Sequence, residues 1–204
     1  ADGAGNIGYN LALTGSNVAS GLYAVDPLAA NGQGTQIVLN QVGNVITGSA
    51  NGVSYFTLTI DPATGAVTLN LLDNVWHGNT GSHDDSVSLT LNSGVLTLVQ
   101  TVTDADGDNA KASIDLGTGG VFRFEDDGPT AGLATQAPSL GSVKVDESLP
   151  ALGGVGGDGI VSATLAAATV QAQFSHAFGA DGAGNIGYNL ALTGSNVASG
   201  LYAV

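Results

Sequence analysis

The chain contains the same 25-letter segment at both ends. Residues 1–25 and residues 180–204 each have the sequence ADGAGNIGYNLALTGSNVASGLYAV. This spacing exceeds the roughly 20–50 residues of a solenoid repeat and suits a whole repeated domain. We therefore expect a piece of a tandem array of near-identical units, whose function is mechanical or spatial because identical units rarely each need an active site. An enzyme with an internal duplication is the less favoured interpretation.

The charge balance excludes several classes of partner. The chain has 3 lysines and arginines against 17 aspartates and glutamates, a formal net charge of −14. Nucleic acid and anionic lipid both need basic side chains, so neither is expected as a partner. No stretch is long and apolar enough for a membrane-spanning helix, and we expect no membrane insertion. Cysteine is absent, so a stabilising element other than disulfides is needed, and a divalent cation is the natural candidate.

The hydropathy pattern indicates strands and turns throughout. The chain has 32 glycines, and β-branched residues fill the segments between them. The predicted strands are Ile7–Leu13, Gln36–Leu39, Val45–Thr47, Ser54–Ile60, Ala66–Leu72, Ser86–Leu91, Gly94–Thr103, Ala110–Leu116 and Val121–Phe124. Only Leu165–Gln173 has a pattern compatible with a helix.

Two hairpins are expected. Asp61-Pro62-Ala63-Thr64-Gly65 has the composition of a hairpin loop and joins two alternating segments. The second hairpin pairs the strand ending at Thr103 with Ala110–Leu116, whose alanines, isoleucine and leucine face one way while Lys111, Ser113 and Asp115 face the other. An all-β, antiparallel sandwich is the predicted fold class.

A change of composition divides the chain. Residues 128–142 are rich in Pro, Ala, Gly and Ser without periodicity, which is typical of a linker. Residues 1–127 are then expected to be the C-terminal bulk of one repeat unit and residues 143–204 the N-terminal part of the next. Neither unit is intact in order, so residues 143–179 are expected either to fold back onto 1–127 or to complete a second chain by strand exchange. We favour exchange, because a spacer should have its ends at opposite poles.

Four groups of acidic residues stand out as candidate cation ligands. Alternate carboxylates with an intervening glycine, as in Asp104-Ala105-Asp106-Gly107-Asp108, let a tight loop surround a hard cation with oxygens. The other groups are Glu125-Asp126-Asp127, Asp146-Glu147 and Asp84-Asp85. Adjacent like charges repel unless a cation lies among them. The competing interpretation of the first group is a solvated turn.

Two calcium motifs match only in part. The first loop departs from an EF-hand because Asn109 stands where glycine is needed and Asp115 replaces the final glutamate. Gly153–Val161 fits one copy of a calcium-binding nonapeptide with Asp158 as its acid, but a single copy cannot share ions with neighbouring turns. A flexible glycine-rich loop is the favoured interpretation of that segment.

Several motifs together resemble a known family. These are VDES before Leu149, GADG, SGLYAV, DPATGAVTL, TVTDADGD, ASIDLG and FRFEDDGPTA. In circularly shifted order they cover nearly the whole chain, and the pairing of DADGD with FEDDGP is the most specific part. The chain resembles the long tandem repeats of giant type I-secreted repeats-in-toxin (RTX) bacterial adhesins.

The resemblance implies Ig-like or cadherin-like β-sandwich extender domains, stiffened by calcium (Ca²⁺) within and between neighbouring identical domains. It also implies an extracellular location at the bacterial cell surface, in cell adhesion and biofilms. The residues that it implies as ligands are Asp104, Asp106, Asp108, Glu125, Asp126, Asp127, Asp146 and Glu147.

Other site chemistries are less favoured. No cysteine and no G-x-S-x-G motif is present, so we expect no enzyme. His77 and His83 with Asp84 lack the spacing of a zinc site. A ligand-binding module, for a glycan or a surface, is the alternative function, and Trp76 beside His77 is its only support. A buried or half-buried structural tryptophan is the simpler interpretation.

Overall fold

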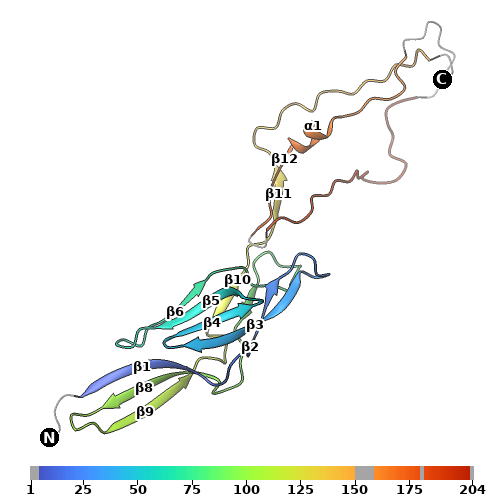
Figure 1. Ribbon diagram of the computed structural model, residues 1–204. Coiled ribbons are helices and arrows are strands. Elements are labelled where there is room, and N and C mark those ends of the chain that lie inside the picture. The colour runs from blue at the N-terminus through green and yellow to red at the C-terminus, as the bar shows by residue number, and fades with distance from the viewer. Residues whose placement is uncertain (1–4, 150–158, 180–181, 203–204) are drawn as a thin grey trace.

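The protein is almost entirely β-structure, as the computed structural model shows (Figure 1). The structure describes residues 5–149, 159–179 and 182–202. The strands are β1 (Asn6–Leu13), β2 (Val18–Val25), β3 (Gln33–Val42), β4 (Val45–Ala50), β5 (Val53–Ile60), β6 (Val67–Leu71), β7 (Ser86–Ser88), β8 (Leu96–Thr103), β9 (Asn109–Asp115), β10 (Arg123–Glu125), β11 (Thr130–Leu133) and β12 (Phe174–Ala177). A short helix, α1 (Ala167–Gln171), lies within the segment for which the sequence allowed a helix.

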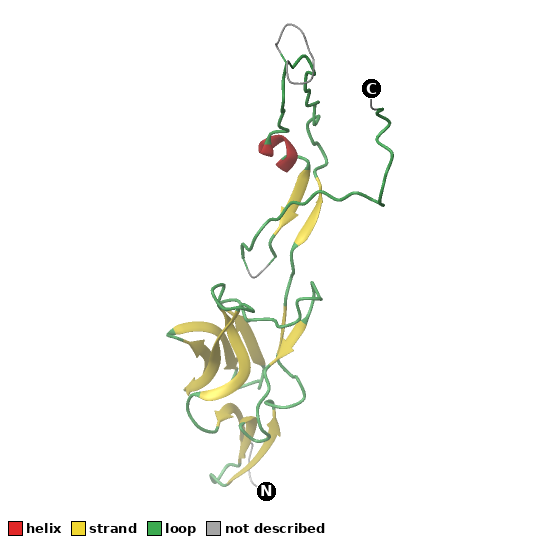
Figure 2. Ribbon diagram, turned by 90° about the vertical axis from the view of Figure 1, so that its right-hand side faces the viewer, coloured by secondary structure: helices red, strands yellow, loops and turns green. Residues whose placement is uncertain are grey.

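Two layers of antiparallel strands form the folded body (Figure 2). One layer is a five-stranded sheet in the order β2-β3-β4-β5-β6, in which each strand pairs with its successor in the chain. The other layer contains the sheet β1-β8-β9 and the pair β10-β7. All of these pairs are antiparallel. The predicted all-β, antiparallel sandwich is confirmed, including both predicted hairpins.

The core forms because alternate residues of each strand face the opposite layer. In β5, Phe56, Leu58 and Ile60 are buried and the intervening threonines are not. Phe56 meets Phe124 of the other layer with ring centroids 4.9 Å apart. Phe56 also lies over Gly48, its cross-strand partner in β4, so glycine at this position makes room for the ring.

One strand of the large sheet was not predicted from the sequence. Strand β2 contains Ser20 and Gly21, residues that are typical of turns. Gly21 has a φ of +79°, and the register with β3 shifts around it. The Ser20 hydroxyl is fully buried and donates to the Ile37 carbonyl at 2.6 Å, while it accepts the Leu22 N–H at 3.1 Å. The local bulge is therefore satisfied by a side chain, and the strand continues through it.

A second difference concerns the predicted strand Ser86–Leu91, of which only Ser86–Ser88 is regular. The chain stays bonded beyond that point but changes partner at each residue. The Leu89 N–H donates to the Phe122 carbonyl, that of Thr90 to Ser20 and that of Leu91 to Gly117. Leu89 and Leu91 are buried, so hydrophobic packing holds this segment where a ladder does not.

The chain beyond Asp127 projects away from the sandwich (Figure 1). Four residues of the predicted linker 128–142 form β11, which pairs with β12. The described residues of the second copy, 182–202, contain no strand. Leu190 is fully exposed, whereas Leu11, the same residue of the first copy, is 1% exposed.

Within the described ranges, every helix is too short or too polar to cross a bilayer.

Packing of Phe56 over Gly48 gives the first prediction. A Cβ on Gly48 would lie 2.4 Å from the Phe56 ring, so Gly48→Ala should lower the free energy of unfolding by about 1–3 kcal/mol. The matched control is Gly8→Ala in β1, where a Cβ meets nothing within 4 Å. That variant should be neutral or slightly stabilising. Urea unfolding measures both, and equal effects would contradict the packing argument.

Candidate metal centre

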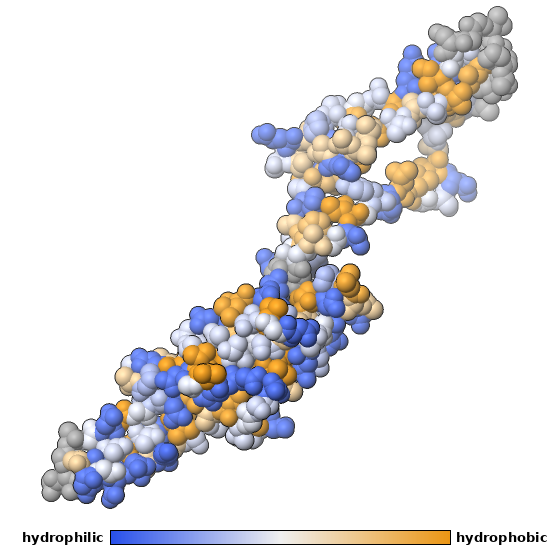
Figure 3. All heavy atoms as spheres, viewed as in Figure 1, coloured by the Kyte–Doolittle hydropathy of each residue, from blue (hydrophilic) through white to orange (hydrophobic). Residues whose placement is uncertain are grey.

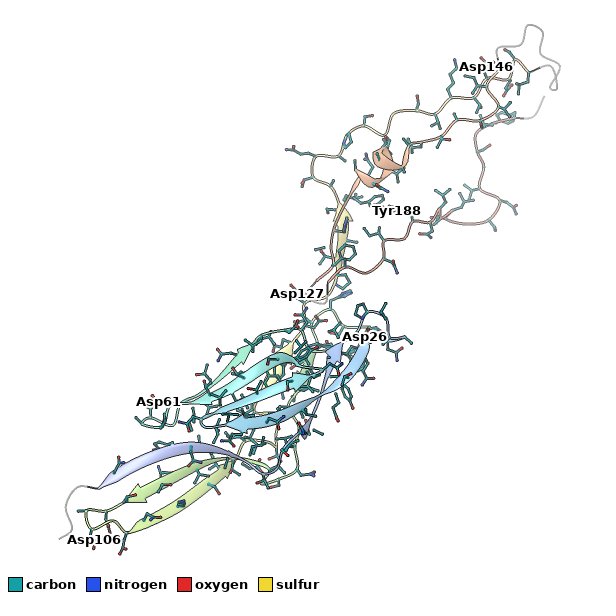
Figure 4. All side chains as sticks on the ribbon, in the orientation of Figure 1. Asp26, Asp61, Asp106, Asp127, Asp146 and Tyr188 are labelled. Atoms are coloured by element: carbon teal, nitrogen blue, oxygen red, sulfur yellow. The ribbon has the colours of Figure 1, made fainter. Side chains whose placement is uncertain are left out.

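The β8–β9 hairpin positions three carboxylates in one loop. The ladder ends at the pair Thr103 and Asn109, so residues 104–108 must reverse the chain. Gly107 has a φ of +101°, a left-handed conformation that glycine adopts without strain. The loop lies at one pole of the sandwich, where Figure 4 labels Asp106.

The side chains of Asp104, Asp106 and Asp108 can hold a metal ion. Each offers a carboxylate oxygen, and these oxygens all lie within 4.8 Å of one another. Ligands of a hard cation such as calcium lie about 2.3–2.6 Å from it, so opposite oxygens of one ion are roughly 5 Å apart. All three side chains are exposed, which leaves room for water to complete a coordination shell. Among the described residues, this is the only such group of three or more acidic or histidine side chains.

Backbone hydrogen bonds order the loop around Asp104. Its carboxylate accepts the N–H of Asp108 at 2.9 Å and the N–H of Gly107 at 3.2 Å. A hydrogen bond with the Asp104 carboxyl, supported by the Asp108 N–H, holds the pKa of Asp106 below its usual value.

Asp115 has a structural role that the sequence did not reveal. Its carboxylate accepts four hydrogen bonds, from the N–H groups of Gly94, Gly117 and Thr118 and from the Ser93 hydroxyl. These donors hold the pKa of Asp115 below its usual value, the Gly94 N–H first. Asp115 thus fastens the base of the hairpin, far from the three-aspartate loop, in keeping with the departure from an EF-hand.

The second predicted cluster lies at the other end of the sandwich, where Figure 4 labels Asp127. Asp126 is half-buried, and its N–H donates to the Asp85 carbonyl at 3.0 Å. Its carboxylate accepts the Asp127 N–H at 2.8 Å, and the Glu125 side chain is exposed. Strand pairing of β10 with β7 therefore brings the Glu125–Asp127 and Asp84–Asp85 segments side by side. Among the described residues, the carboxylates of these two segments do not form a group of three possible metal ligands, either with one another or with Asp104, Asp106 and Asp108.

The third predicted cluster, Asp146 and Glu147, lies in the projecting segment, remote from both poles (Figure 4). The Asp146 carboxylate accepts the Ser148 N–H at 2.9 Å, which holds its pKa below the usual value. Glu147 is exposed. Asp158 of the glycine-rich segment lies outside the described residues.

Two of the histidines, His77 and His83, contact other residues of the chain. His77 Nδ1 lies 3.1 Å from Asp85 Oδ1, and the two side chains are 5% and 14% exposed. The backbone of His83 accepts the Gly128 N–H. His77, His83 and Asp84 do not come together as a three-ligand group in the part of the chain that is described.

Trp76 is half-buried and bonded. Its indole N–H donates to the Asn31 carbonyl at 2.8 Å. Its ring meets Tyr23 edge to face, with centroids 6.2 Å apart. The side chain therefore fastens the loop between β2 and β3 to the segment after β6.

Comparison with known proteins gives one match. A family described as Domain of unknown function (DUF5801) matches residues 1–117, which span β1 to β9 and include the three-aspartate loop. Neither a curated protein nor a solved structure matches the chain.

The hydrogen bonds to Asp115 generate a prediction about acid. Because the folded-state pKa is lowered, the contribution of Asp115 to stability is fully present above the unfolded value of about 4 and is lost as the pH falls through the folded value. Asp115→Asn should therefore destabilise the protein more at pH 7 than at a pH below the folded value. Urea unfolding at both pH values measures this difference.

The matched control for this prediction is Asp84→Asn, which changes an exposed carboxylate on another loop. Its effect should be small at both pH values. A destabilisation by Asp115→Asn that is the same in acid would show that the ionised carboxylate contributes nothing.

Proposed function

Since the chain belongs to the DUF5801 family, described only as a domain of unknown function, we propose its function from its own residues. It acts as a calcium-stabilised structural extender domain of a giant secreted bacterial adhesin. It stiffens the adhesin and projects it from the cell surface. Its partners are the neighbouring identical repeat domains.

The observation that carries the proposal is the group of three aspartates at one pole of a sandwich in a repeated sequence. Strand β1 begins opposite Thr103, so the chain enters the sandwich beside this group. It leaves at Asp127, at the opposite end (Figure 4). Consecutive domains joined at such poles line up end to end, and an ion at a pole stiffens the place where flexibility between domains would arise.

The ligand chemistry supports calcium over other ions. The group offers oxygen only, since cysteine is absent from the chain and the three ligands are all aspartates. Carboxylates suit hard cations, whereas zinc and copper prefer imidazole and thiolate. Magnesium requires near-ideal octahedral geometry, while calcium accepts irregular shells completed by carbonyls and water. An exposed loop that offers several oxygens can form the irregular coordination shell that calcium accepts.

The alternative function, a glycan- or surface-binding module, has less support. It depended on Trp76, whose indole N–H is bonded to Asn31 and whose ring packs on Tyr23. A sugar platform needs an aromatic face free to stack on the ligand. The proposed role includes no turnover of a substrate.

Calcium binding provides the central test. Calcium should raise the melting temperature and chelator should lower it, since an ion that binds only the folded state contributes about 2.7 kcal/mol at one hundred times its Kd. Replacing Asp104, Asp106 and Asp108 by Asn should abolish the part of this response that comes from the loop. Calorimetric titration with calcium would measure the loss of binding directly.

Asp61→Asn, which changes an exposed carboxylate of the β5–β6 loop outside the four acidic groups, serves as the control for a general charge effect and should keep the response to calcium. If melting curves in calcium and in chelator coincide, the calcium-stabilised extender is wrong. A response of the melting temperature to calcium that survives the triple substitution would show that the ion binds outside this loop.

A separate prediction distinguishes the extender from the binding module. Trp76→Phe removes the indole hydrogen bond to Asn31 and should lower the free energy of unfolding by about 1 kcal/mol. In a glycan-binding screen, neither the unsubstituted chain nor this variant is expected to bind a glycan. Saturable glycan binding by the chain, lost on Trp76→Ala in a variant that still folds, would favour the binding module.

A further inference from the structure

Two polar side chains are buried together at the end of the sandwich where the chain leaves it. His77 follows β6, and Asp85 precedes β7. The His77 side chain is 5% exposed and that of Asp85 14%, and His77 Nδ1 lies 3.1 Å from Asp85 Oδ1. Neither atom has a hydrogen-bond partner among the described residues, so this close approach is not itself a hydrogen bond. Polar atoms buried in this way are costly unless a further group binds them.

A third polar side chain, that of Asp126, lies across from Asp85. The last opposed residues of the β10–β7 pair are Glu125 and Ser86. The same register continues one step further, since the Asp126 N–H donates to the Asp85 carbonyl at 3.0 Å. Opposed residues of an antiparallel pair share a face, with Cβ atoms about 4.5–5.5 Å apart. Asp126 and Asp85 therefore lie on the face that carries the buried Phe124 ring toward the core.

A small cavity of about 50 Å³ lies beside these groups. His77, Phe124 and Asp126 are among the residues that line it. Leu71 and Glu125 also line it and are exposed, so solvent reaches the cavity. The volume is enough for an ion together with water, since one water molecule needs about 10–15 Å³ of such space. Like charges directly opposite each other in a strand pair are destabilising, and a cation in this cavity removes that repulsion.

We propose that His77, Asp85 and Asp126 bind a divalent transition-metal ion such as zinc, separate from the calcium proposed for the three-aspartate loop. Ligand atoms about 2.1 Å from one ion are roughly 3.0–3.4 Å apart, and the distance of 3.1 Å between the His77 nitrogen and the Asp85 oxygen lies in that range. An imidazole nitrogen combined with carboxylates is typical of zinc, whereas calcium takes oxygen ligands.

Only the first two ligands are already in contact. The Asp126 carboxylate accepts the Asp127 N–H at 2.8 Å and has to turn about its side-chain bonds to reach the ion. Because Asp126 lines the cavity and lies opposite Asp85, this turn needs no movement of the backbone. Water completes the coordination shell from the solvent side of the cavity.

The ion fastens the place where the chain leaves the sandwich. Its ligands come from three segments, which follow β6, precede β7 and end β10. Beyond Asp127 the molecule narrows into the projecting segment (Figure 3), so a crosslink here fixes the last part of the sandwich before that narrowing. The site depends on neither the repeat nor the three-aspartate loop. It can therefore fail while the calcium-stabilised extender holds, or hold where the extender fails.

The chain has only 3 histidines, which permits a test that leaves the proposed ligands unchanged. His83 and His176 are exposed and line a common pocket, so they are the obvious ligands for adventitious zinc. The full chain with both replaced by alanine keeps His77 as its only histidine. At saturating calcium, zinc should bind this variant saturably and shift the NMR resonances of the His77 ring nitrogens. No saturable zinc binding, or binding that leaves these resonances unmoved, would overturn the proposal.

Substitution of a ligand provides the second measurement. Asp85→Asn keeps the size of the side chain and should weaken zinc binding at least about tenfold in calorimetric titration, because even residues that only orient a ligand contribute about ten- to a hundredfold. The matched control is Asp84→Asn, which makes the same change on the neighbouring exposed side chain and should bind zinc as before. Both variants should keep the response to calcium of the three-aspartate loop. Equal zinc affinities for the two variants, or zinc that calcium displaces, would overturn the proposal.

Discussion

The pairing of β1 with β8 is the interaction on which the rest of the structure depends. It joins the first copy of the repeated segment to the hairpin that carries the three aspartates, through eight opposed residue pairs from Asn6–Thr103 to Leu13–Leu96. It carries Leu11 into the core against the large sheet. Without β8, the backbone groups of β1 would have to find other partners, since strands are stable only in pairs.

The sheet that this pairing builds has one part that packs in the core and one part that is exposed to solvent. The part of the β1-β8-β9 sheet that faces the five-stranded sheet supplies core residues such as Leu96, which is fully buried. The part beyond that contact has no opposite layer among the described residues, so its backbone is bonded while its side chains remain exposed. The acidic loop can tolerate three like charges there because all three are exposed to water, whose high dielectric constant weakens their repulsion.

Local patterns predicted the elements in which each residue acts through its neighbours in the chain. Alternation in β5 and the loop chemistry at Asp61 predicted the β5–β6 hairpin, and spaced carboxylates predicted the group at Asp104–Asp108. The pattern failed at β2, because Ser20 is satisfied by a carbonyl of β3 that is distant in sequence. It also failed to assign Asp115, whose role depends on donors from two separate turns.

By itself, the sequence determined an antiparallel β-fold, an acidic loop and a duplicated segment, since alternation, charge and identity are local properties. Only the tertiary structure decided what each copy of that segment becomes. In the first copy, Leu11 is 1% exposed within β1; in the second, the identical Leu190 is fully exposed and outside any strand. The letters are the same, but the first copy has β8 and β3 to pair with, and a strand exists only where another chain segment satisfies its hydrogen bonds and covers its apolar side.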